Sequence, residues 1–302
     1  MIVAVLGASG ELGTLVVEAL LTKTNVNTVR AVVRKSTEQL NALKASHDRR
    51  LDIAIVDYDS PASLDIALAG VYSAVSTLQG MRPVLIDLQS KLLSACIKNN
   101  VKRFIPSDFA YDFISVAKLN YAETPRGYNH FHEAAKAIIA SSGKSIEFIP
   151  ISIGMFMDLF PTDTFQIMDW NKKYVGYFGD EDTKQEFTTY RNTAEFTARV
   201  LTDPKPITKT HFHIAGHQAS PKELAALISE ATGETFVAHQ ALSLPFAGMD
   251  VIWGNGWSAW PKEKLDNDYY GPVIEWTQVQ DVVKTEYELR KKGLAGKDKF
   301  KN

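Results

Sequence analysis

Three features are scarce in this sequence: cysteine, long apolar runs and an excess of either charge. The single cysteine, Cys96, cannot close an internal disulfide, and it lies in a helical pattern of apolar residues that predicts a buried side chain. This cysteine usage is typical of a reducing compartment, so we expect a cytoplasmic protein. No segment approaches the roughly 18 consecutive apolar residues needed to cross a bilayer. The apolar start, residues 1–6, runs into a glycine turn without a basic stretch before it, so we expect neither a membrane span nor a signal peptide.

Positive and negative side chains nearly balance. The chain carries 33 Lys and Arg residues against 35 Asp and Glu, a formal net charge of −2, and the two signs are intermixed. Such a surface lacks the basic face that offsets nucleic-acid phosphates, so we expect no nucleic-acid partner of electrostatic type. With 45% hydrophobic residues over 302 positions, the chain can bury a large core.

Apolar runs of strand length alternate with helical periods through the first half of the chain. This alternation predicts an α/β fold of the Rossmann type: a doubly wound parallel sheet, order 3-2-1-4-5-6, with helices on both faces. The predicted strands cover residues 2–6, 28–33, 52–56, 71–77, 102–105 and 146–151. The two helices before the last two strands are predicted at 84–99 and 129–142.

Three helix starts carry capping signals. Ser36 begins a Ser-Thr-Glu-Gln sequence that is typical of a capping box and predicts Ser36 as the N-cap. Ser60 stands before Pro61, a pair that suits an N-cap and a first helical position. Ser220 and Glu223 form another capping-box pattern.

The regular alternation ends at residue 151. Residues 152–302 have shorter apolar pieces, many aromatics and dispersed Gly and Pro, which indicates a smaller C-terminal α/β lobe. We predict a Rossmann-type domain over residues 1–151 and a second lobe over 152–302, partly interleaved with the first. The charged end of the chain is expected to fray from residue 297 onwards.

Glycines recur at every third position in the turn after the first predicted strand, at Gly7, Gly10 and Gly13. The first permits a tight turn, the second lets a phosphate approach the backbone, and the third lets helix and strand pack closely. The N–H groups at the start of the following helix point toward the same place. The turn therefore predicts a site for the pyrophosphate of a dinucleotide.

The end of the second predicted strand indicates which dinucleotide is preferred. An NAD-binding protein usually carries an acidic residue about twenty positions after the glycines, where it binds the ribose 2′-hydroxyl. Here Arg34 and Lys35 occupy that place. A guanidinium can hold a 2′-phosphate in a bidentate pair, so we expect NADP(H) as the cofactor. The alternative is that both are solvated charges at a strand end.

Several segments together resemble a known family. They are the glycine turn, Arg34, Ala-Val-Ser-Thr at 74–77 and Val-Lys-Arg-Phe-Ile-Pro-Ser-Asp-Phe at 101–109. These are similar to the NmrA-like and isoflavone reductase-like branch of the atypical short-chain dehydrogenases/reductases. Leu-Asp-Asn-Asp at 265–268 and Ile-Glu-Trp-Thr at 274–277 are similar to its aromatic alcohol reductase-like members. The resemblance implies an NADPH-dependent reduction of phenylpropanoid-type substrates, or NADP(H) binding by a regulator without turnover.

The resemblance also implies site residues. Cofactor contacts are expected from the turn and from later strand ends, at Ser9, Glu11, Leu12, Arg34, Thr77, Leu78, Gln79 and Ser107. Asp108 and Phe109 are expected to edge the active cleft, since open α/β sheets bind ligands at their carboxyl strand ends. Met155 and Phe156 follow the sixth strand and are expected to contact an aromatic substrate. They begin an aromatic-rich set: Phe156, Leu159, Phe160, Phe165, Met168, Trp170, Phe246, Met249, Trp253, Trp257 and Trp260.

One departure from the family pattern concerns catalysis. The plant reductases place a lysine on the helix before strand six, and here that position falls on His132. An imidazole can act as a general acid, although a solvated or core-bound histidine is the alternative. Lys136, one helical turn on, would take the role if the register differs by a turn. Tyr128, four residues before His132, is a candidate proton donor or an aromatic wall residue.

Two other chemistries find no support. His211, His213 and His217 lack carboxylate or cysteine partners at ligand-like spacing, so we expect no metal. No Gly-x-Ser-x-Gly elbow follows a strand, which removes the hydrolase alternative. Two hypotheses remain: a reductase of a small aromatic carbonyl or alkene, and an NADP(H)-binding regulator that signals through a protein partner.

Overall fold

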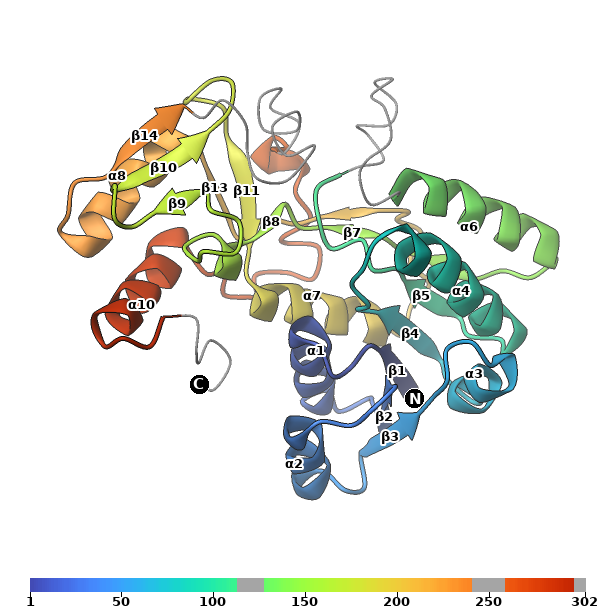
Figure 1. Ribbon diagram of the computed structural model, residues 1–302. Helices are drawn as coiled ribbons and strands as arrows, with labels where there is room; N and C mark the ends of the chain where they lie inside the picture. The colour runs from blue at the N-terminus through green and yellow to red at the C-terminus, as the bar shows by residue number, and fades with distance from the viewer. Residues whose placement is uncertain (113–127, 241–258, 296–302) are drawn as a thin grey trace. The chain divides into compact units, whose positions relative to one another are not determined.

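The computed structural model describes residues 1–112, 128–240 and 259–295 (Figure 1). The chain folds into two compact units. The first consists of Met1–Phe109, Phe113–Ile151 and Thr193–Phe212, and the second of Ala110–Asp112, Ser152–Asn192 and His213–Asn302. The predicted division after residue 151 shares the boundary between Ile151 and Ser152 with this one. The structural division differs because the chain returns to the first unit for Thr193–Phe212 and leaves it for Ala110–Asp112.

A six-stranded parallel sheet forms the centre of the first unit. Its strands are β1 (Ile2–Leu6), β2 (Thr28–Val33), β3 (Leu51–Ile55), β4 (Ser73–Ser76), β5 (Arg103–Ile105) and β6 (Glu147–Phe148). Their order across the sheet is β3-β2-β1-β4-β5-β6, which confirms the predicted doubly wound topology. The four central strands, β2, β1, β4 and β5, are mostly buried, as expected when helices cover both sides of a parallel sheet, whereas the edge strands β3 and β6 are partly exposed.

Helices cover the two faces of this sheet (Figure 1). They are α1 (Glu11–Leu21), α2 (Glu38–Ser46), α3 (Pro61–Leu68), η1 (Pro83–Leu88), α4 (Gln89–Lys98) and α6 (Tyr128–Ser142). Apolar side chains of α3, α4 and α6 form one buried cluster with the sheet, which includes Leu64, Leu92, Cys96 and Phe131. Cys96 is fully buried, as predicted, and burial raises the pKa of its thiol.

Three local predictions need correction. The N-cap of α2 is Thr37 rather than Ser36: the Thr37 hydroxyl accepts from the Leu40 N–H, while Ser36 donates to Asn41. The helix expected over 84–99 is a π-helical segment, η1, followed by α4. The sixth strand ends at Phe148 instead of residue 151, because Pro150 has no N–H to continue the ladder.

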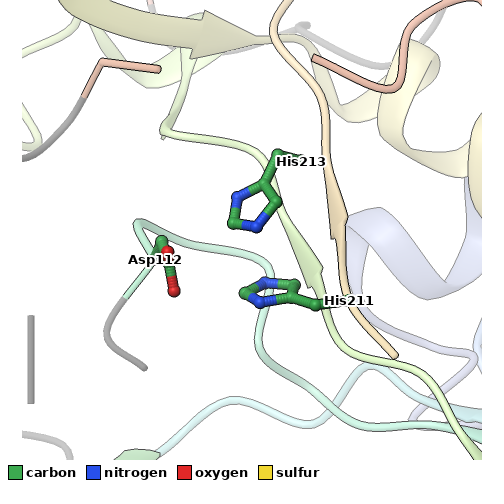
Figure 2. A group of neighbouring side chains, drawn as sticks. All are labelled: Asp112, His211 and His213. Carbon is green, nitrogen blue, oxygen red and sulfur yellow. The ribbon is translucent and has the colours of Figure 1, made fainter. Parts of the chain in front are cut away.

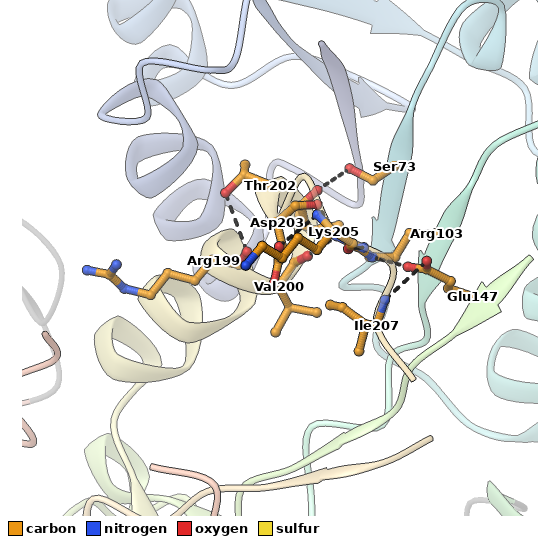
Figure 3. Close-up of polar contacts among 10 residues, drawn as sticks. Ser73, Arg103, Glu147, Arg199, Val200, Thr202, Asp203, Lys205 and Ile207 are labelled. Carbon is orange, nitrogen blue, oxygen red and sulfur yellow. Dashed lines mark hydrogen bonds and ion pairs between the residues drawn. The ribbon is translucent and has the colours of Figure 1, made fainter. Parts of the chain in front are cut away.

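Arg103 on β5 anchors a long connection to the sheet (Figure 3). Its side chain is 1% exposed, and Nε donates to Glu147 Oε2 at 2.6 Å. Nη1 donates to the backbone carbonyls of Val200 and Asp203, and Nη2 donates to that of Lys205. The Val200 carbonyl belongs to the last turn of α7 (Tyr190–Thr202), and the other two follow the helix, so one buried cation binds both the end of α7 and the chain after it.

The described residues of the second unit form two three-stranded sheets. Their strands are β8 (Met155–Phe156), β11 (Gln185–Thr188), β13 (His217–Ala219), β9 (Met168–Asp169), β10 (Tyr174–Tyr177) and β14 (Val237–Gln240). Its described part also contains the helices η2 (Met157–Leu159), α8 (Pro221–Thr232), η3 (Lys262–Lys264) and α10 (Val279–Lys291). Ser220 and Glu223 form the predicted capping box at the start of α8. The strands β7 (Ile151–Ser152) and β12 (Phe212–His213) straddle the boundary between the units.

Within the described residues, no helix has both the length and the apolar character that a bilayer span requires.

Candidate cofactor and active site

The glycine turn after β1 is packed so closely that side chains are excluded at two positions. Gly7 has φ of +88°, a left-handed conformation that favours glycine. A Cβ atom on Gly13 would lie 2.8 Å from both the Ala8 Cα and the Thr77 Oγ1. Helix α1 therefore approaches β1 and β4 at a distance that only glycine permits.

The start of α1 presents uncapped backbone. Gly10 is the N-cap residue and has no side chain with which to satisfy the first N–H groups of the helix. Ser9, Gly10 and Glu11 are exposed, while Leu12 and Gly13 are buried. A Cβ on Gly10 would meet only the Gly7 carbonyl oxygen, at 3.5 Å, so the space in front of the helix is open. This arrangement suits an anionic group, which the helix N-terminus would stabilise.

Arg34 and Lys35 follow directly after the last residue of β2, and both are exposed. Close to them lies Tyr58, whose hydroxyl donates to the Val32 carbonyl oxygen at 3.2 Å. Burial raises the pKa of Tyr58 to about 12, while the Gly7 backbone and the positive charge of Arg34 oppose the rise. No sequence signal pointed to Tyr58, which comes from the loop after β3.

Side-chain hydrogen bonds connect the carboxyl ends of β1, β4 and β5. Thr77 Oγ1 donates to the carbonyl oxygens of Leu6 and Gly7, at 3.1 and 3.2 Å. Ser107 Oγ donates to the Leu78 carbonyl oxygen at 2.8 Å. Thr77 and Ser107 thus hold the carboxyl edge of the sheet together, and both belong to the predicted cofactor set.

Two further residues complete this edge. Gln89 Oε1 accepts from the Ser107 N–H at 2.7 Å, a contact that the sequence analysis missed because Gln89 lies on a separate helix. Gln79, also predicted to face the cofactor, is exposed at the same end of the sheet.

Asp108 and His132 form a buried pair at the same edge. His132 Nε2 lies at hydrogen-bond distance from Asp108 Oδ2, and the two residues are only 7% and 6% exposed. The imidazole packs edge-on against Phe148, with ring centroids 5.5 Å apart. Asp108 follows β5 and His132 lies in the first half of α6, so the structure brings together one predicted substrate residue and one predicted catalytic residue.

The two other catalytic candidates lie elsewhere on α6. Lys136 is exposed, and its ammonium pairs with Glu133 at 2.7 Å. It does not share the buried environment of His132. Tyr128 is the first residue of α6, and its side chain lies outside the described part of the structure.

The predicted aromatic substrate residues occupy apolar surroundings. Phe109 is buried in the first unit. In the second unit, Met155 is buried and Phe156 stacks on Tyr190, with ring centroids 3.9 Å apart. The predicted positions Phe246, Met249, Trp253 and Trp257 lie outside the described residues.

Glu186 on β11 is a buried carboxyl group that sequence reasoning did not single out. Its Oε1 accepts from the Trp260 N–H at 2.6 Å and from Gln218 Nε2 at 3.0 Å. Burial raises the pKa of Glu186 to about 7, the two hydrogen bonds oppose the rise, and the negative charge of Asp112 adds to it.

Among the described residues, Asp112, His211 and His213 form a group whose ligand atoms all lie within 4.8 Å of one another (Figure 2). Two histidines and one carboxylate are ligands that zinc accepts. Asp112 supplies the carboxylate that no sequence spacing revealed. His217 is not part of the group, and its Nδ1 lies 2.7 Å from Gln278 Oε1. The expectation that the protein binds no metal stays a prediction.

A doubly wound parallel sheet with a glycine turn at the start of its first helix defines a Rossmann-type α/β protein. The model of the NmrA-like family matches residues 1–277, and the chain belongs to that family. The chain is 30% identical over 250 residues to the NmrA-like family domain-containing oxidoreductase of Gibberella moniliformis, covering 77% of each. It is 28% identical over 217 residues to pinoresinol reductase 2 of Arabidopsis thaliana, covering 69% of this chain and 67% of that protein.

Solved structures share the fold. The structure of AtPrR2 with NADP+ and (+)pinoresinol matches with a TM-score of 0.74 at 20% identity, over 94% of this chain and 97% of that one. The Citrobacter sp. triphenylmethane reductase complexed with NADP(H) matches with a TM-score of 0.71 at 20% identity, over 94% and 99%. These likenesses confirm the predicted Rossmann-type architecture.

Proposed function

We propose that this protein is an NADPH-dependent reductase of a small aromatic carbonyl or alkene compound of phenylpropanoid type. The observation that carries the proposal is the uncapped, glycine-lined start of α1. There the backbone N–H groups would hold the pyrophosphate of NADP(H), and Gly10 leaves room for it. The relatives support the same function, because several of them are named as oxidoreductases or reductases.

The preference for NADP(H) over NAD(H) rests on Arg34 and Lys35. Both are exposed just beyond β2, the position where NAD-binding folds carry an acidic residue. Arg34 would grip the 2′-phosphate in a charge-assisted pair, and Lys35 would add a second positive charge. An unphosphorylated ribose would gain nothing from either group.

His132 would supply the proton in this reaction. When bound, the nicotinamide supplies the hydride that reduces the substrate. The reduced carbonyl or alkene then needs a proton on oxygen or carbon, and an imidazole can give one near neutral pH. His132 lies at the carboxyl edge of the sheet, the edge at which open α/β folds bind their ligands.

The substrate class is inferred from aromatic surfaces and from relatives. Phe156 and Tyr190 form a stacked pair in the second unit that offers a flat apolar face. Pinoresinol reductase 2 is named for an aromatic substrate, and a chain of the same family can be expected to take a compound of similar chemistry.

A coupled binding and turnover experiment tests the proposal. NADPH and NADH are titrated by fluorescence, and aromatic aldehydes, ketones and enoyl compounds are then screened for NADPH oxidation by the wild type and by His132→Ala. The proposal expects saturable NADPH binding in both proteins and turnover by the wild type alone. Tight NADPH binding without any turnover would favour the regulatory alternative, and no binding would remove both.

A further inference from the structure

Asp108 and His132 are joined by a contact that determines which ring nitrogen carries a proton. The acceptor is a carboxylate oxygen, Asp108 Oδ2, and it faces His132 Nε2. An ionised carboxylate can only accept, so Nε2 must be the protonated nitrogen. Phe131 and Phe148 pack against the imidazole edge-on, with centroids 6.0 and 5.5 Å away, and keep the ring in this orientation.

The second ring nitrogen, Nδ1, is in a different situation. No described residue forms a hydrogen bond with Nδ1. The described residues include several polar atoms that are fully buried without a partner, and Nδ1 is not one of them. Among the described residues, Nδ1 is therefore the ring nitrogen that no hydrogen bond engages. Because Nε2 is committed to Asp108, any proton that His132 exchanges with a ligand passes through Nδ1.

A purely structural role, in which the pair only attaches α6 to the sheet, explains this arrangement poorly. The second carboxylate oxygen, Asp108 Oδ1, is buried and has no hydrogen-bond partner among the described residues. A buried acceptor left in this state costs about 1–3 kcal/mol. Apolar residues of similar volume would join the two elements at no such cost. A buried polar group without a partner in a native structure calls for an explanation, and a catalytic role is one of them.

We propose that Asp108 and His132 form a proton-transfer dyad in which Asp108 is the positioning residue and His132 exchanges its proton at Nδ1. The inference rests on the proposed reductase function. As hydride reaches the substrate carbon, the imidazolium gives its Nδ1 proton to the developing alkoxide or carbanion. The product has then gained one hydride and one proton, and His132 is a neutral imidazole that still donates Nε2–H to Asp108. Solvent returns the proton to Nδ1.

The tautomer can be observed without any substrate. Two-dimensional ¹⁵N–¹H spectra of histidine-labelled protein, above the pH at which the ring is charged, distinguish Nε2–H from Nδ1–H, and a His132→Gln sample assigns the signals. The dyad expects Nε2–H in the wild type. In Asp108→Asn the side-chain amide can donate to Nε2, so the proton should move to Nδ1. A wild-type His132 protonated at Nδ1 would overturn the proposal.

Kinetics separate positioning from a structural role. Asp108→Asn is expected to lower kcat on the order of 100-fold or more, as for other carboxylates that orient a catalytic imidazole. The Kd for NADPH and the substrate KM should stay within about threefold, since these reflect binding rather than proton transfer. Asp87→Asn, an exposed aspartate on η1, is the matched control and should leave kcat unchanged.

Two failures have different signatures. A wild type that binds NADPH but turns over no compound ends the proposed reductase function and with it the dyad. A wild type that turns over, with an Asp108→Asn kcat within threefold, leaves the reductase function intact and overturns the dyad alone.

Discussion

Gly13 lies so close to Thr77 that a Cβ atom at Gly13 would be 2.8 Å from the Thr77 hydroxyl oxygen. The same atom would lie 2.8 Å from the Ala8 Cα and closer still to the Gly7 carbonyl oxygen. The backbone atoms cannot rotate away, and the Thr77 hydroxyl is already bonded to the carbonyl oxygens of Leu6 and Gly7. The position of α1 against the sheet therefore depends on the absence of a side chain at Gly13.

Gly13→Ala is expected to destabilise the protein and to weaken NADPH binding. Forcing a methyl group into this contact should lower the free energy of unfolding by about 1–3 kcal/mol. It should also move the start of α1, and we expect at least a tenfold loss of NADPH affinity, about 1.4 kcal/mol. Urea unfolding measures the first effect and fluorescence titration the second.

Gly10→Ala is the matched variant. Gly10 has extended φ and ψ, and its Cβ would meet only the Gly7 carbonyl oxygen at 3.5 Å, an ordinary contact. Stability should therefore change by no more than about 0.5 kcal/mol. NADPH affinity should still fall, because the methyl group would project into the space proposed for the pyrophosphate. Unchanged affinity in Gly10→Ala would contradict the placement of the phosphate at this turn.

The sheet could be predicted from the sequence because its signals are local. β1 and β2 end where their apolar runs end, and the doubly wound order follows from the alternation of strands and helices. The details that were missed depend on competition between neighbouring groups. Ser36 and Thr37 can each cap α2, and the hydrogen bond from Leu40 to Thr37 decides between them.

The candidate site was predictable only in part, for the same reason. The glycine turn is a continuous segment, so its packing can be inferred from residue types. The Asp108–His132 pair joins residues 24 positions apart, and the Glu186–Trp260 contact spans 74 positions. Side-chain pairing over such separations depends on the tertiary fold, which a single sequence does not reveal.

Arg34→Ala should weaken the preference for NADPH over NADH. Loss of one charge-assisted contact to the 2′-phosphate costs about 1.5–3 kcal/mol, so NADPH affinity is expected to fall by about 10- to 100-fold while NADH affinity stays the same. Lys35→Ala, the neighbouring exposed cation, should have a smaller effect. Parallel titrations with both nucleotides at one salt concentration measure the change. Equal losses of affinity for NADPH and NADH would show that Arg34 does not bind the 2′-phosphate.

Arg103→Met tests whether the buried cation anchors the connection after α7. Removing the guanidinium leaves Glu147 Oε2 and the carbonyls of Val200, Asp203 and Lys205 without the donor they share (Figure 3). We expect a loss of about 3–5 kcal/mol in the free energy of unfolding. Lys91→Met removes the exposed pair with Asp59 and should cost no more than about 1 kcal/mol. Similar losses in the two variants would refute the anchoring role.

Glu186 should make the protein less stable as the pH rises from 4.5 to 7. The folded-state pKa of this acid is raised to about 7 from 4.5, so between these values the folded protein binds more protons than the unfolded chain. Stability therefore falls with pH in this window and is constant outside it, apart from other groups. The full shift corresponds to about 3 kcal/mol.

Glu186→Gln keeps an oxygen that can accept from the Trp260 N–H but removes the charge. Relative to the wild type, this variant should become more stable as the pH rises from 5 to 8. Over this range only the wild type has to ionise a buried carboxyl group, or keep on it a proton that the unfolded chain releases. Urea midpoints for both proteins at the two pH values measure the difference, and groups that titrate in both proteins cancel. A wild-type-minus-variant difference that is the same at pH 5 and pH 8 would mean that Glu186 ionises normally in the folded protein.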